Sequence, residues 1–486
     1  MSEQKYDLVI IGAGSGGLTA AGFATRLGAK VALVEKRRIG GDCTWTGCVP
    51  SKALLKAAKI AHAVRSAAHY GITAGAPVTD MRRVREYVRE AIQQVYQFER
   101  PEDLAREGID VVIGAARFLD AHTIDVNGQH IFAKSFLITT GADPSIPAIT
   151  GLSEVSYLTY EQIFDNEVLP KRMIVVGGGP IGMEMAQAYQ RLGSQVTVVA
   201  EQLLPKEEPE VREVMLRVFE REGIRVVSGR ASSAEKNGDS FVVRAGDEDV
   251  SGDLLLIASG RKPSVAGLDL ENAGVTYSQR GIAIDSQLRT SVKHIYAAGD
   301  VTGGHQFTHF AGWQAFQAVR NALLPGSSSG LTDLVPWVTF TDPEVAHVGM
   351  TAAQAKEKFA DGFEVRLWEM SHTDRAVCEN DTDGFIKLIL KDDGTILGAT
   401  IVAARAGEAI TELIVAIKQG LKATDLAGAI HAYPTYSTAV QQMAADVAVE
   451  SCCQAYRERL YGDSPGSFAK VGAATGWNSP ATSLRQ

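Results

Sequence analysis

Apolar residues along the chain form short runs that alternate with amphipathic stretches. The runs at residues 8–11 and 31–34 have the length of buried strands. Residues 81–98 instead space their apolar side chains three or four positions apart, beside many charges, as one face of a helix does. Strands that alternate with helices predict an α/β fold.

A glycine-rich turn follows the first apolar run. Gly12, Gly14 and Gly17 form a G-x-G-x-x-G motif between the expected strand at 8–11 and a helix expected at 18–27. Glu35 ends the next strand, about 20 residues later, where a ribose-binding acid belongs. The glycines allow a tight turn, and the helix N-terminus can hold a pyrophosphate. This stretch therefore predicts a dinucleotide site.

A second unit of the same kind begins at residue 173. Its turn contains Gly177, Gly179 and Gly182 between expected strands at 173–176 and 196–199. Ala200 lies at the usual place of the ribose acid, and Glu201 follows it. A 2′-phosphate favours arginine there, so the sequence predicts a preference for NADH over NADPH.

Two cysteines lie five positions apart within residues 40–52, immediately before an alanine-rich helical stretch. Cys43 and Cys48 can form a small-loop disulfide if the backbone brings them together. Cys48 lies at the expected helix N-terminus, which stabilises a thiolate. The alternative is two unrelated buried cysteines, and the pair by itself does not decide between these interpretations.

Composition narrows the class of protein. The chain has 486 residues, enough for about three domains. Its formal charge of −9 argues against nucleic-acid binding, and five cysteines in this length do not make a secreted disulfide framework. There is neither a basic-then-apolar leader nor an apolar run of the ~20 residues that a membrane span needs. We expect a soluble cytoplasmic protein, in which a disulfide is more often catalytic than structural.

Three further strands complete a recognisable order of motifs. They end at Gly141, at Gly260 and at Asp300. Together with the two glycine turns and the G-G-x-C-x-x-x-x-C-V-P-S-K stretch, roughly residues 5–450 resemble the flavoprotein disulfide reductases. This family includes dihydrolipoamide dehydrogenase, glutathione reductase and mercuric reductase.

The resemblance implies roles for individual residues. Cys48 would be the charge-transfer thiolate beside the flavin, and Cys43 the interchange thiol that meets the substrate. Lys52 would lie by the flavin and pair with Glu184, while Asp300 would bind the ribityl chain. Glycines and acids of the two units would bind FAD and the nicotinamide dinucleotide: Gly12, Gly14, Gly17, Glu35 and Gly141, and Gly177, Gly179, Gly182, Glu201 and Gly260.

The resemblance also implies the domain organisation. Two Rossmann-like dinucleotide-binding domains would be followed by a C-terminal α+β dimerisation domain. We expect a discontinuous FAD domain at 1–150 and 281–334, an NAD(P)H domain at 151–280, and an interface domain at 335–460. A flexible tail would occupy 461–486. The family forms homodimers with shared active sites, so we expect a homodimer here.

One position departs from the commonest pattern. Lipoamide and glutathione reductases carry an H-x-H-P-T motif and a glutamate a few residues later, the acid/base pair of the site. Here Tyr433 replaces the second histidine and Thr438 the glutamate, while His431 remains. A tyrosine, with an ordinary pKa of about 10, is a poor base near neutrality. The sequence indicates no carboxylate to orient it, and His431 is either an acid or a packed side chain.

Mercuric reductases also lack this histidine and have a vicinal cysteine pair near the C-terminus. Cys452 and Cys453 are such a pair, and are either a relay for Hg(II) or core residues of a continuous helix at 437–460. Cys378 is expected to be structural. The favoured function is therefore NAD(P)H- and FAD-dependent reduction of Hg(II). The alternatives are reduction of an organic disulfide, and a flavin-binding redox sensor with little turnover.

Overall fold

The computed structural model describes residues 4–461 and 481–484. The chain forms two compact units, residues 1–203 with 219–332, and residues 204–218 with 333–486. Each unit has its own hydrophobic cores, and each is described by itself.

The first unit is built on a seven-stranded sheet of order β3-β2-β1-β6-β5-β4, with β18 paired to β6. Strands β3, β2, β1, β6 and β18 run parallel, whereas β5 and β4 are antiparallel additions. The strands are β1 (Gln4–Ile11), β2 (Val31–Glu35), β3 (Ile109–Ile113), β4 (Ala116–Asp120), β5 (Thr123–Val126), β6 (Gln129–Ile138) and β18 (Ile295–Ala297). The last strand ends at Ala297, before the expected end at Asp300, because Gly299 has a left-handed φ of 77° and begins a short turn, Gly299–Thr302.

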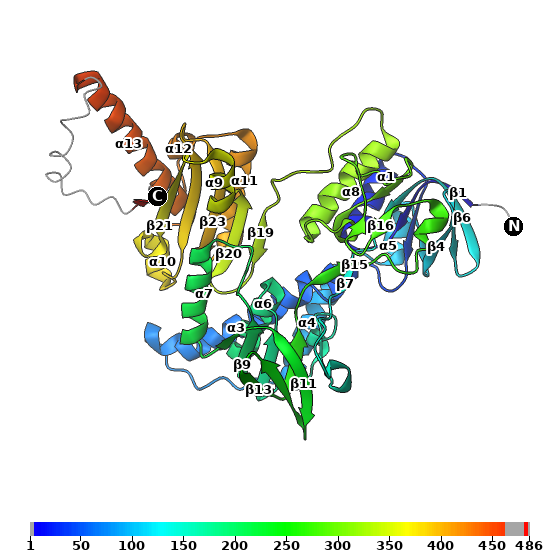
Figure 1. The fold of residues 1–486 in the computed structure, drawn as a ribbon, viewed down its shortest axis with the longest axis horizontal. Helices are drawn as coiled ribbons and strands as arrows, with labels where there is room; N and C mark the ends of the chain where they lie inside the picture. The colour runs from blue at the N-terminus through cyan, green and yellow to red at the C-terminus, as the bar shows by residue number, and fades with distance from the viewer. Residues whose placement is uncertain (1–3, 462–480, 485–486) are drawn as a thin grey trace. The chain divides into compact units, whose positions relative to one another are not determined.

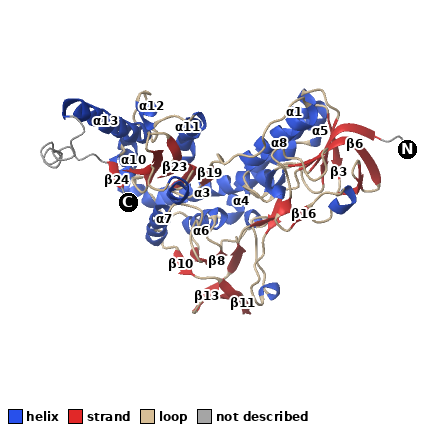
Figure 2. Ribbon diagram, turned by 45° about the horizontal axis from the view of Figure 1, so that its top comes forward, coloured by secondary structure: helices blue, strands red, loops and turns tan. Residues whose placement is uncertain are grey.

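Helices α1 (Ser15–Arg26) and α8 (Thr308–Leu323) pack against each other beside this sheet (Figures 1 and 2). The cysteine segment forms α2 (Gly41–Trp45) and α3 (Cys48–Ser66). Helix α3 begins at Cys48, the N-terminal position expected from the sequence, and Pro50 lies in its first turn, where proline is tolerated. Two more helices follow, α4 (Met81–Tyr96) and α5 (Pro101–Arg106).

The second nucleotide unit lies in the same compact body. Its parallel sheet has the order β10-β9-β8-β14 and carries α6 (Pro180–Leu192) after its glycine turn. A three-stranded antiparallel sheet, which the sequence analysis did not anticipate, precedes β14 in the chain. The strands of these two sheets are β8 (Arg172–Val176), β9 (Gln195–Ala200), β10 (Arg225–Ser228) and β14 (Leu254–Ile257), and β11 (Ala231–Asn237), β12 (Ser240–Ala245) and β13 (Glu248–Gly252). Two separate two-stranded sheets pair β7 (Ala142–Pro144) with β15 (Arg261–Pro263) and β16 (Tyr277–Ser278) with β17 (Gly281–Ile282).

The second unit contains a six-stranded antiparallel sheet of order β19-β20-β23-β22-β21-β24. Its strands are β19 (Trp337–Thr339), β20 (Glu344–Gly349), β21 (Phe363–Glu369), β22 (Phe385–Lys391), β23 (Ile396–Ala403) and β24 (Ala481–Leu484). Its helices are α7 (Pro209–Arg221), α9 (Ala352–Phe359), α10 (Asp374–Glu379), α11 (Ala406–Gln419), α12 (Ala423–Ala427) and α13 (Thr438–Tyr461). Helix α11 packs on β20 and β23. Most of the expected tail, 462–480 and 485–486, lies outside the described residues, whereas β24 pairs with β21.

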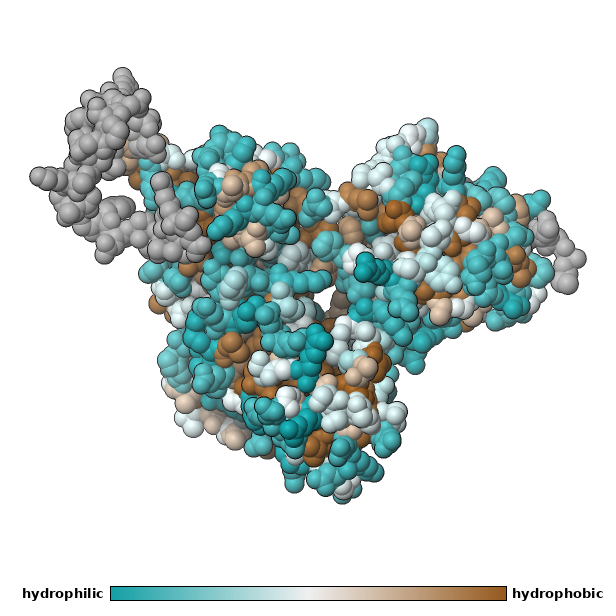
Figure 3. Space-filling model, in the orientation of Figure 1, coloured by the Kyte–Doolittle hydropathy of each residue, from teal (hydrophilic) through white to brown (hydrophobic). Residues whose placement is uncertain are grey.

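Apolar side chains are concentrated in these cores, and the face drawn in Figure 3 is mainly hydrophilic with scattered hydrophobic patches. Among the described residues, no helix is both long and apolar enough to cross a membrane.

Candidate active site

The first glycine turn has the conformation that a dinucleotide site needs. Gly12 has a left-handed φ of 106°, and a Cβ there would lie 2.4 Å from the Thr139 carbonyl oxygen. A Cβ on Gly17 would lie 1.9 Å from the Gly12 carbonyl oxygen. The turn is held by the buried Glu35, which accepts a hydrogen bond from the Ala13 backbone N–H at 2.8 Å. Only glycine fits this close packing of α1 against the turn.

A cavity of about 1130 Å³ opens from this turn. Its walls include Gly14 and Glu35 at the turn, Gly141 on the neighbouring strand end, and Cys43. Where the cysteine segment passes the turn, a Cβ on Gly41 would lie 2.7 Å from the Gly14 Cα. The cavity thus combines a pyrophosphate cradle, a buried acid and a thiol along one continuous surface, which fits FAD.

The two thiols of the cysteine segment lie together. Cys43 is in α2 and Cys48 is the first residue of α3; both are free thiols, partly buried, and their sulfurs hydrogen-bond to each other. The pKa of Cys48 is lowered, first by the hydrogen bond from Cys43 and then by Thr308 and by the charge of Lys52. The pKa of Cys43 is raised by its hydrogen bond to Cys48 and by burial. These surroundings therefore favour the negative charge on Cys48 over Cys43.

Lys52 and Glu184 form an ion pair one turn further along α3. The Lys52 Nζ lies 2.9 Å from a carboxylate oxygen of Glu184. Glu184 is buried on α6, and α3 packs against α6. The pair joins the cysteine helix to the helix that follows the second glycine turn.

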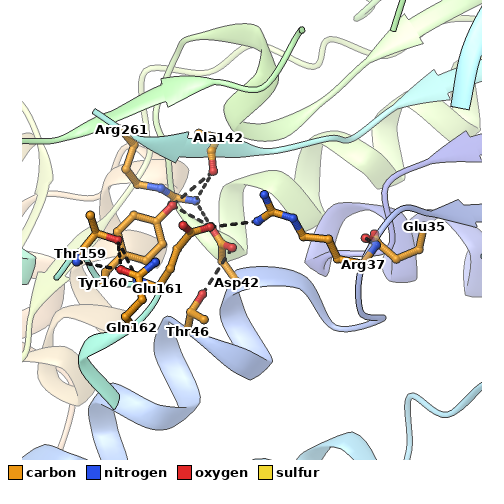
Figure 4. A network of polar contacts seen from close by, with 10 residues as sticks. All are labelled: Glu35, Arg37, Asp42, Thr46, Ala142, Thr159, Tyr160, Glu161, Gln162 and Arg261. Carbon is orange, nitrogen blue, oxygen red and sulfur yellow. Dashed lines mark hydrogen bonds and ion pairs between the residues drawn. The ribbon is translucent and has the colours of Figure 1, made fainter. Parts of the chain in front are cut away.

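Figure 4 shows a polar network in which Asp42 of α2, the residue before Cys43, lies among Thr46, Tyr160 and Arg261. Asp42 accepts hydrogen bonds from the Tyr160 hydroxyl at 3.1 Å and from the Arg261 guanidinium at 2.5 Å. Arg261 also lies 2.9 Å from a carboxylate oxygen of Asp300, so the largely buried guanidinium is shared by two acids. Burial raises the pKa of the Asp300 carboxyl above its ordinary value.

Four residues of this region received no role from the sequence: Asp42, Tyr160, Arg261 and Thr308. Asp42 directly precedes Cys43, and Arg261 follows Gly260 in a G-R-x-P motif; these were the available signals. Tyr160 and Thr308 have no motif of their own. Among the residues expected to bind FAD, five line the same cavity: Gly12, Gly14, Glu35, Gly141 and Asp300.

The second glycine turn repeats the geometry of the first. Gly177 has a φ of 129°, and Gly182 lies against it, since a Cβ there would be 2.1 Å from the Gly177 carbonyl oxygen. Gly179 is the N-cap residue of α6, and Gly260 has a φ of 109°. At the end of β9, the exposed Glu201 carboxylate lies 2.9 Å from the Arg230 guanidinium.

The structure corrects the expectation that Tyr433 has no carboxylate partner. The Tyr433 hydroxyl donates to Asp374 at 2.7 Å, although the ring is 68% exposed. This hydrogen bond raises the pKa of Tyr433 further above its ordinary value. Asp374 lies 59 positions away in sequence, on α10, which is why no local motif indicated it.

His431 also has an acidic partner. Its Nε2 lies 2.7 Å from a carboxylate oxygen of Glu412 on α11, and its Nδ1 lies 3.1 Å from the Ala429 carbonyl oxygen. Burial raises the pKa of Glu412. The second unit therefore contains a His–Glu pair, built from a different glutamate position than the one the family motif uses.

The remaining cysteines are exposed. Cys452 and Cys453 lie on α13, a continuous helix, but the interpretation that this helix buries them is wrong: its buried side chains lie at earlier positions such as Val440 and Val447. Cys378, expected to be structural, is exposed on α10. Within the described part of the chain, no group of three or more His, Cys, Asp or Glu side chains is placed to hold a metal ion.

Fold and site together define a flavin-dependent disulfide oxidoreductase. Residues 6–315 match the pyridine nucleotide-disulphide oxidoreductase family, and residues 335–444 match its dimerisation domain. The chain therefore belongs to this family. It is an FAD- and NAD(P)H-dependent enzyme of the disulfide oxidoreductase class, and its dimerisation domain supports a homodimer.

Particular relatives are similar over nearly the whole chain. Mercuric reductase of Bacillus cereus is 36% identical over 464 residues, 92% of this chain and 73% of that protein. Mercuric reductase of Staphylococcus aureus is 37% identical over 469 residues, 93% of this chain and 85% of that protein. The copper(II) complex of the HOCl-induced flavoprotein disulfide reductase RclA from Escherichia coli has a TM-score of 0.83 at 29% identity, covering 92% of this chain and 100% of that one.

Proposed function

We propose that this enzyme reduces Hg(II) to elemental mercury with electrons from NADH. The balance is NADH + Hg(II) → NAD⁺ + Hg(0) + H⁺, a two-electron transfer throughout. Bound FAD supplies the hydride acceptor that passes the electron pair on to a disulfide. The observation that carries the proposal is Tyr433, which occupies the place of the family's catalytic histidine. Similarity to mercuric reductases supports it.

Different residues of the chain would have different roles in this electron transfer. Cys48 would hold the thiolate beside the flavin and Cys43 would exchange with the acceptor. Lys52, kept charged by Glu184, would favour the negative charge of the reduced flavin. A tyrosine can donate a hydrogen bond yet does not serve as a base near neutrality. Hg(II) bound to soft thiolates needs no base for a leaving thiol, so Tyr433 suits a metal acceptor.

We also propose the domain and subunit assignment. FAD would occupy residues 1–150 with 281–334, NAD(P)H residues 151–280, and dimer contacts residues 335–460. The pairing of β18 with β6 supports the return of the chain to the FAD domain. In a homodimer with shared sites, Tyr433 would face the partner subunit's Cys43. We propose a cytoplasmic location, where reduced thiols persist.

The test measures NADH consumption with Hg(II) in excess thiol. Hg(II) should increase the rate of NADH consumption by the native enzyme. Lipoamide, oxidised glutathione and an aryl disulfide should increase that rate much less. Failure of Hg(II) to stimulate turnover would overturn the proposal. Flavin reduction by NADH without turnover on any acceptor would instead favour the redox sensor.

The exposed Cys452–Cys453 pair is proposed as the relay that delivers Hg(II). A Cys452→Ala/Cys453→Ala variant should lose Hg(II) reduction at low thiol concentration, whereas reduction of an aryl disulfide should be unchanged. Cys378→Ala, which removes another exposed thiol of the same unit, is the matched control. Equal loss in the control would show that thiol number, rather than the pair, matters.

The second candidate is reduction of an organic disulfide, and the His431–Glu412 contact favours it. A histidine held by a carboxylate can protonate a leaving thiolate. If this candidate holds, His431→Gln should abolish disulfide turnover and leave NADH-driven flavin reduction intact. If Hg(II) is the acceptor, the same variant should retain most of its activity.

We propose that the enzyme prefers NADH because Glu201 can accept hydrogen bonds from the ribose hydroxyls. Its partner Arg230 is the basic group beside that position. Glu201→Ala should release Arg230 toward a 2′-phosphate and raise the NADPH/NADH ratio of kcat/KM by about tenfold. Glu201→Ala combined with Arg230→Ala should cancel that gain. Better use of NADPH by the native enzyme would contradict the preference.

A further inference from the structure

We propose that Thr308 is a positioning residue of the redox pair, whose hydroxyl donates a hydrogen bond to the Cys48 thiolate. The inference rests on the proposed role of Cys43 and Cys48 and is independent of the final acceptor. It concerns a residue 260 positions away from Cys48 in sequence, which no motif indicated.

The contact is direct. The Thr308 Oγ1 lies 3.2 Å from the Cys48 Sγ, within the same compact unit. Thr308 is the first residue of α8 and Cys48 the first residue of α3, so two helix N-termini meet at this sulfur. Helices of 19 and 16 residues both place the positive ends of their dipoles there. Thr308 and Cys43 line the same cavity.

The direction of the hydrogen bond follows from the chemistry of sulfur. A thiol can donate or accept, but a thiolate can only accept. Once Cys48 carries the negative charge, the threonine hydroxyl must be the donor. The other groups facing Cys48 are Cys43, Lys52 and Glu184; the first two favour the thiolate and the third opposes it. Thr308 adds a neutral donor from a separate helix.

The same hydroxyl also reaches Cys43, as does Ser15. A hydroxyl has a single hydrogen, so Thr308 can serve one thiolate at a time. When two electrons cleave the Cys43–Cys48 bond, one sulfur must take up a proton and the other keeps the charge. The protonated sulfur is Cys43, and Thr308 stabilises the charge on Cys48. The residue therefore helps to decide which sulfur exchanges and which faces the flavin.

The test uses the FAD-loaded enzyme after reduction by two electrons. A thiolate beside oxidised flavin absorbs at long wavelength, and the pH midpoint of that absorbance reports the pKa of Cys48. Thr308→Val, which has nearly the same shape without the hydroxyl, should raise the midpoint by about one pH unit. Thr308→Ser should retain the native midpoint. The matched control is Thr46→Val. Thr46 lines the same cavity, but its hydroxyl contacts Asp42 rather than a sulfur.

A second readout does not depend on flavin absorbance. The rate of Cys48 alkylation by iodoacetamide, followed by peptide mass, should shift to higher pH in Thr308→Val by the same amount. If Thr308→Val does not fold, comparing Thr308→Ser with Thr308→Ala provides the same contrast.

The role of Thr308 and the assignment of Cys48 are contradicted by different results. An unchanged midpoint in Thr308→Val, or a shift of equal size in Thr308→Ser, would overturn the role of Thr308 alone. A native enzyme without the long-wavelength absorbance, or one in which Cys48→Ala leaves it intact, would overturn the assignment of Cys48 and this proposal with it.

Discussion

At the scale of single residues, Asp42 illustrates how the site holds a buried cation. The Arg261 side chain is only 20% exposed and its charge is balanced by Asp42 and Asp300. Tyr160 adds a hydrogen bond to the same carboxylate and lies 5.2 Å from the guanidinium, measured to the ring centre. The short helix α2, which carries Cys43, is therefore tied to β15 by a shared charge.

Asp42→Asn should remove that charge while keeping the shape of the side chain. Arg261 would retain only Asp300, and we expect the free energy of unfolding to fall by about 1–2 kcal/mol, because Asp42 is 37% exposed and solvent screens part of the interaction. Alkylation of Cys43 should become faster as α2 loosens. Thermal unfolding and alkylation rates measure the two effects. Thr46→Val, which loses only a 3.4 Å contact to Asp42, should change neither; an equal effect there would contradict this role of the charge.

At the scale of elements, the segment leading into α7 contains a buried acid that is only partly hydrogen-bonded. Glu207 is almost fully buried and its Oε1 accepts a hydrogen bond from the Trp337 ring N–H at 2.5 Å. Its Oε2 has no hydrogen-bond partner among the described residues. The neighbouring Glu208 is paired with Lys387 at 3.0 Å. Burial, with a contribution from the Glu208 charge, raises the pKa of Glu207 to about 7.

This pKa makes stability depend on pH in a defined direction. The unfolded chain releases the Glu207 proton near its ordinary pKa of 4.5, whereas the folded chain keeps it up to about 7. The contribution to stability is therefore complete below pH 4.5 and is lost as the pH rises through 7. Glu207→Gln should remove this loss, so between pH 5 and 8 the native enzyme should lose about 2 kcal/mol relative to the variant.

Denaturant unfolding at a series of pH values measures that difference. Glu213→Gln, which alters an exposed acid on α7, is the matched control and should follow the native curve. Parallel pH dependence of native enzyme and Glu207→Gln would show that Glu207 does not titrate in this range.

At the scale of the whole molecule, the cavity of the first unit makes folding depend on the cofactor. Strands β1 and β2, residues 139–143 that follow β6, helix α1 and the cysteine segment all contribute to its walls. A ligand that binds only the folded state stabilises it by mass action. Removal of FAD should therefore lower the Tm, and FAD restored at about 100 times its Kd should return about 2.7 kcal/mol.

Calorimetry of the enzyme with and without FAD tests this dependence. NADH alone, added to the FAD-free protein, is the control for general nucleotide binding and should return less stability. Identical Tm values with and without FAD would contradict the assignment of the cavity.

The sequence by itself determined the class of this protein. Glycine turns such as Gly12–Gly17 can be recognised because the backbone passes so close to its neighbours that side chains are excluded. The need for glycine is therefore visible within a few consecutive residues of the sequence. The strand β2 covers the apolar run at 31–34 and the acid Glu35 that was expected to end it, since burial on both faces needs continuous apolar residues. The spacing of Cys43 and Cys48, read together with both turns, likewise identified the redox segment.

Only the tertiary structure decided which side chains meet across long sequence distances. Thr308 with Cys48, Asp42 with Arg261, and Tyr433 with Asp374 are pairs separated by 260, 219 and 59 positions. A single threonine or aspartate forms no sequence pattern from which its distant partner could be predicted, because its contacts depend on how helices and strands pack. The exposure of Cys452 and Cys453 was decided in the same way, because the buried positions of α13 in the described part of the chain end at Val447.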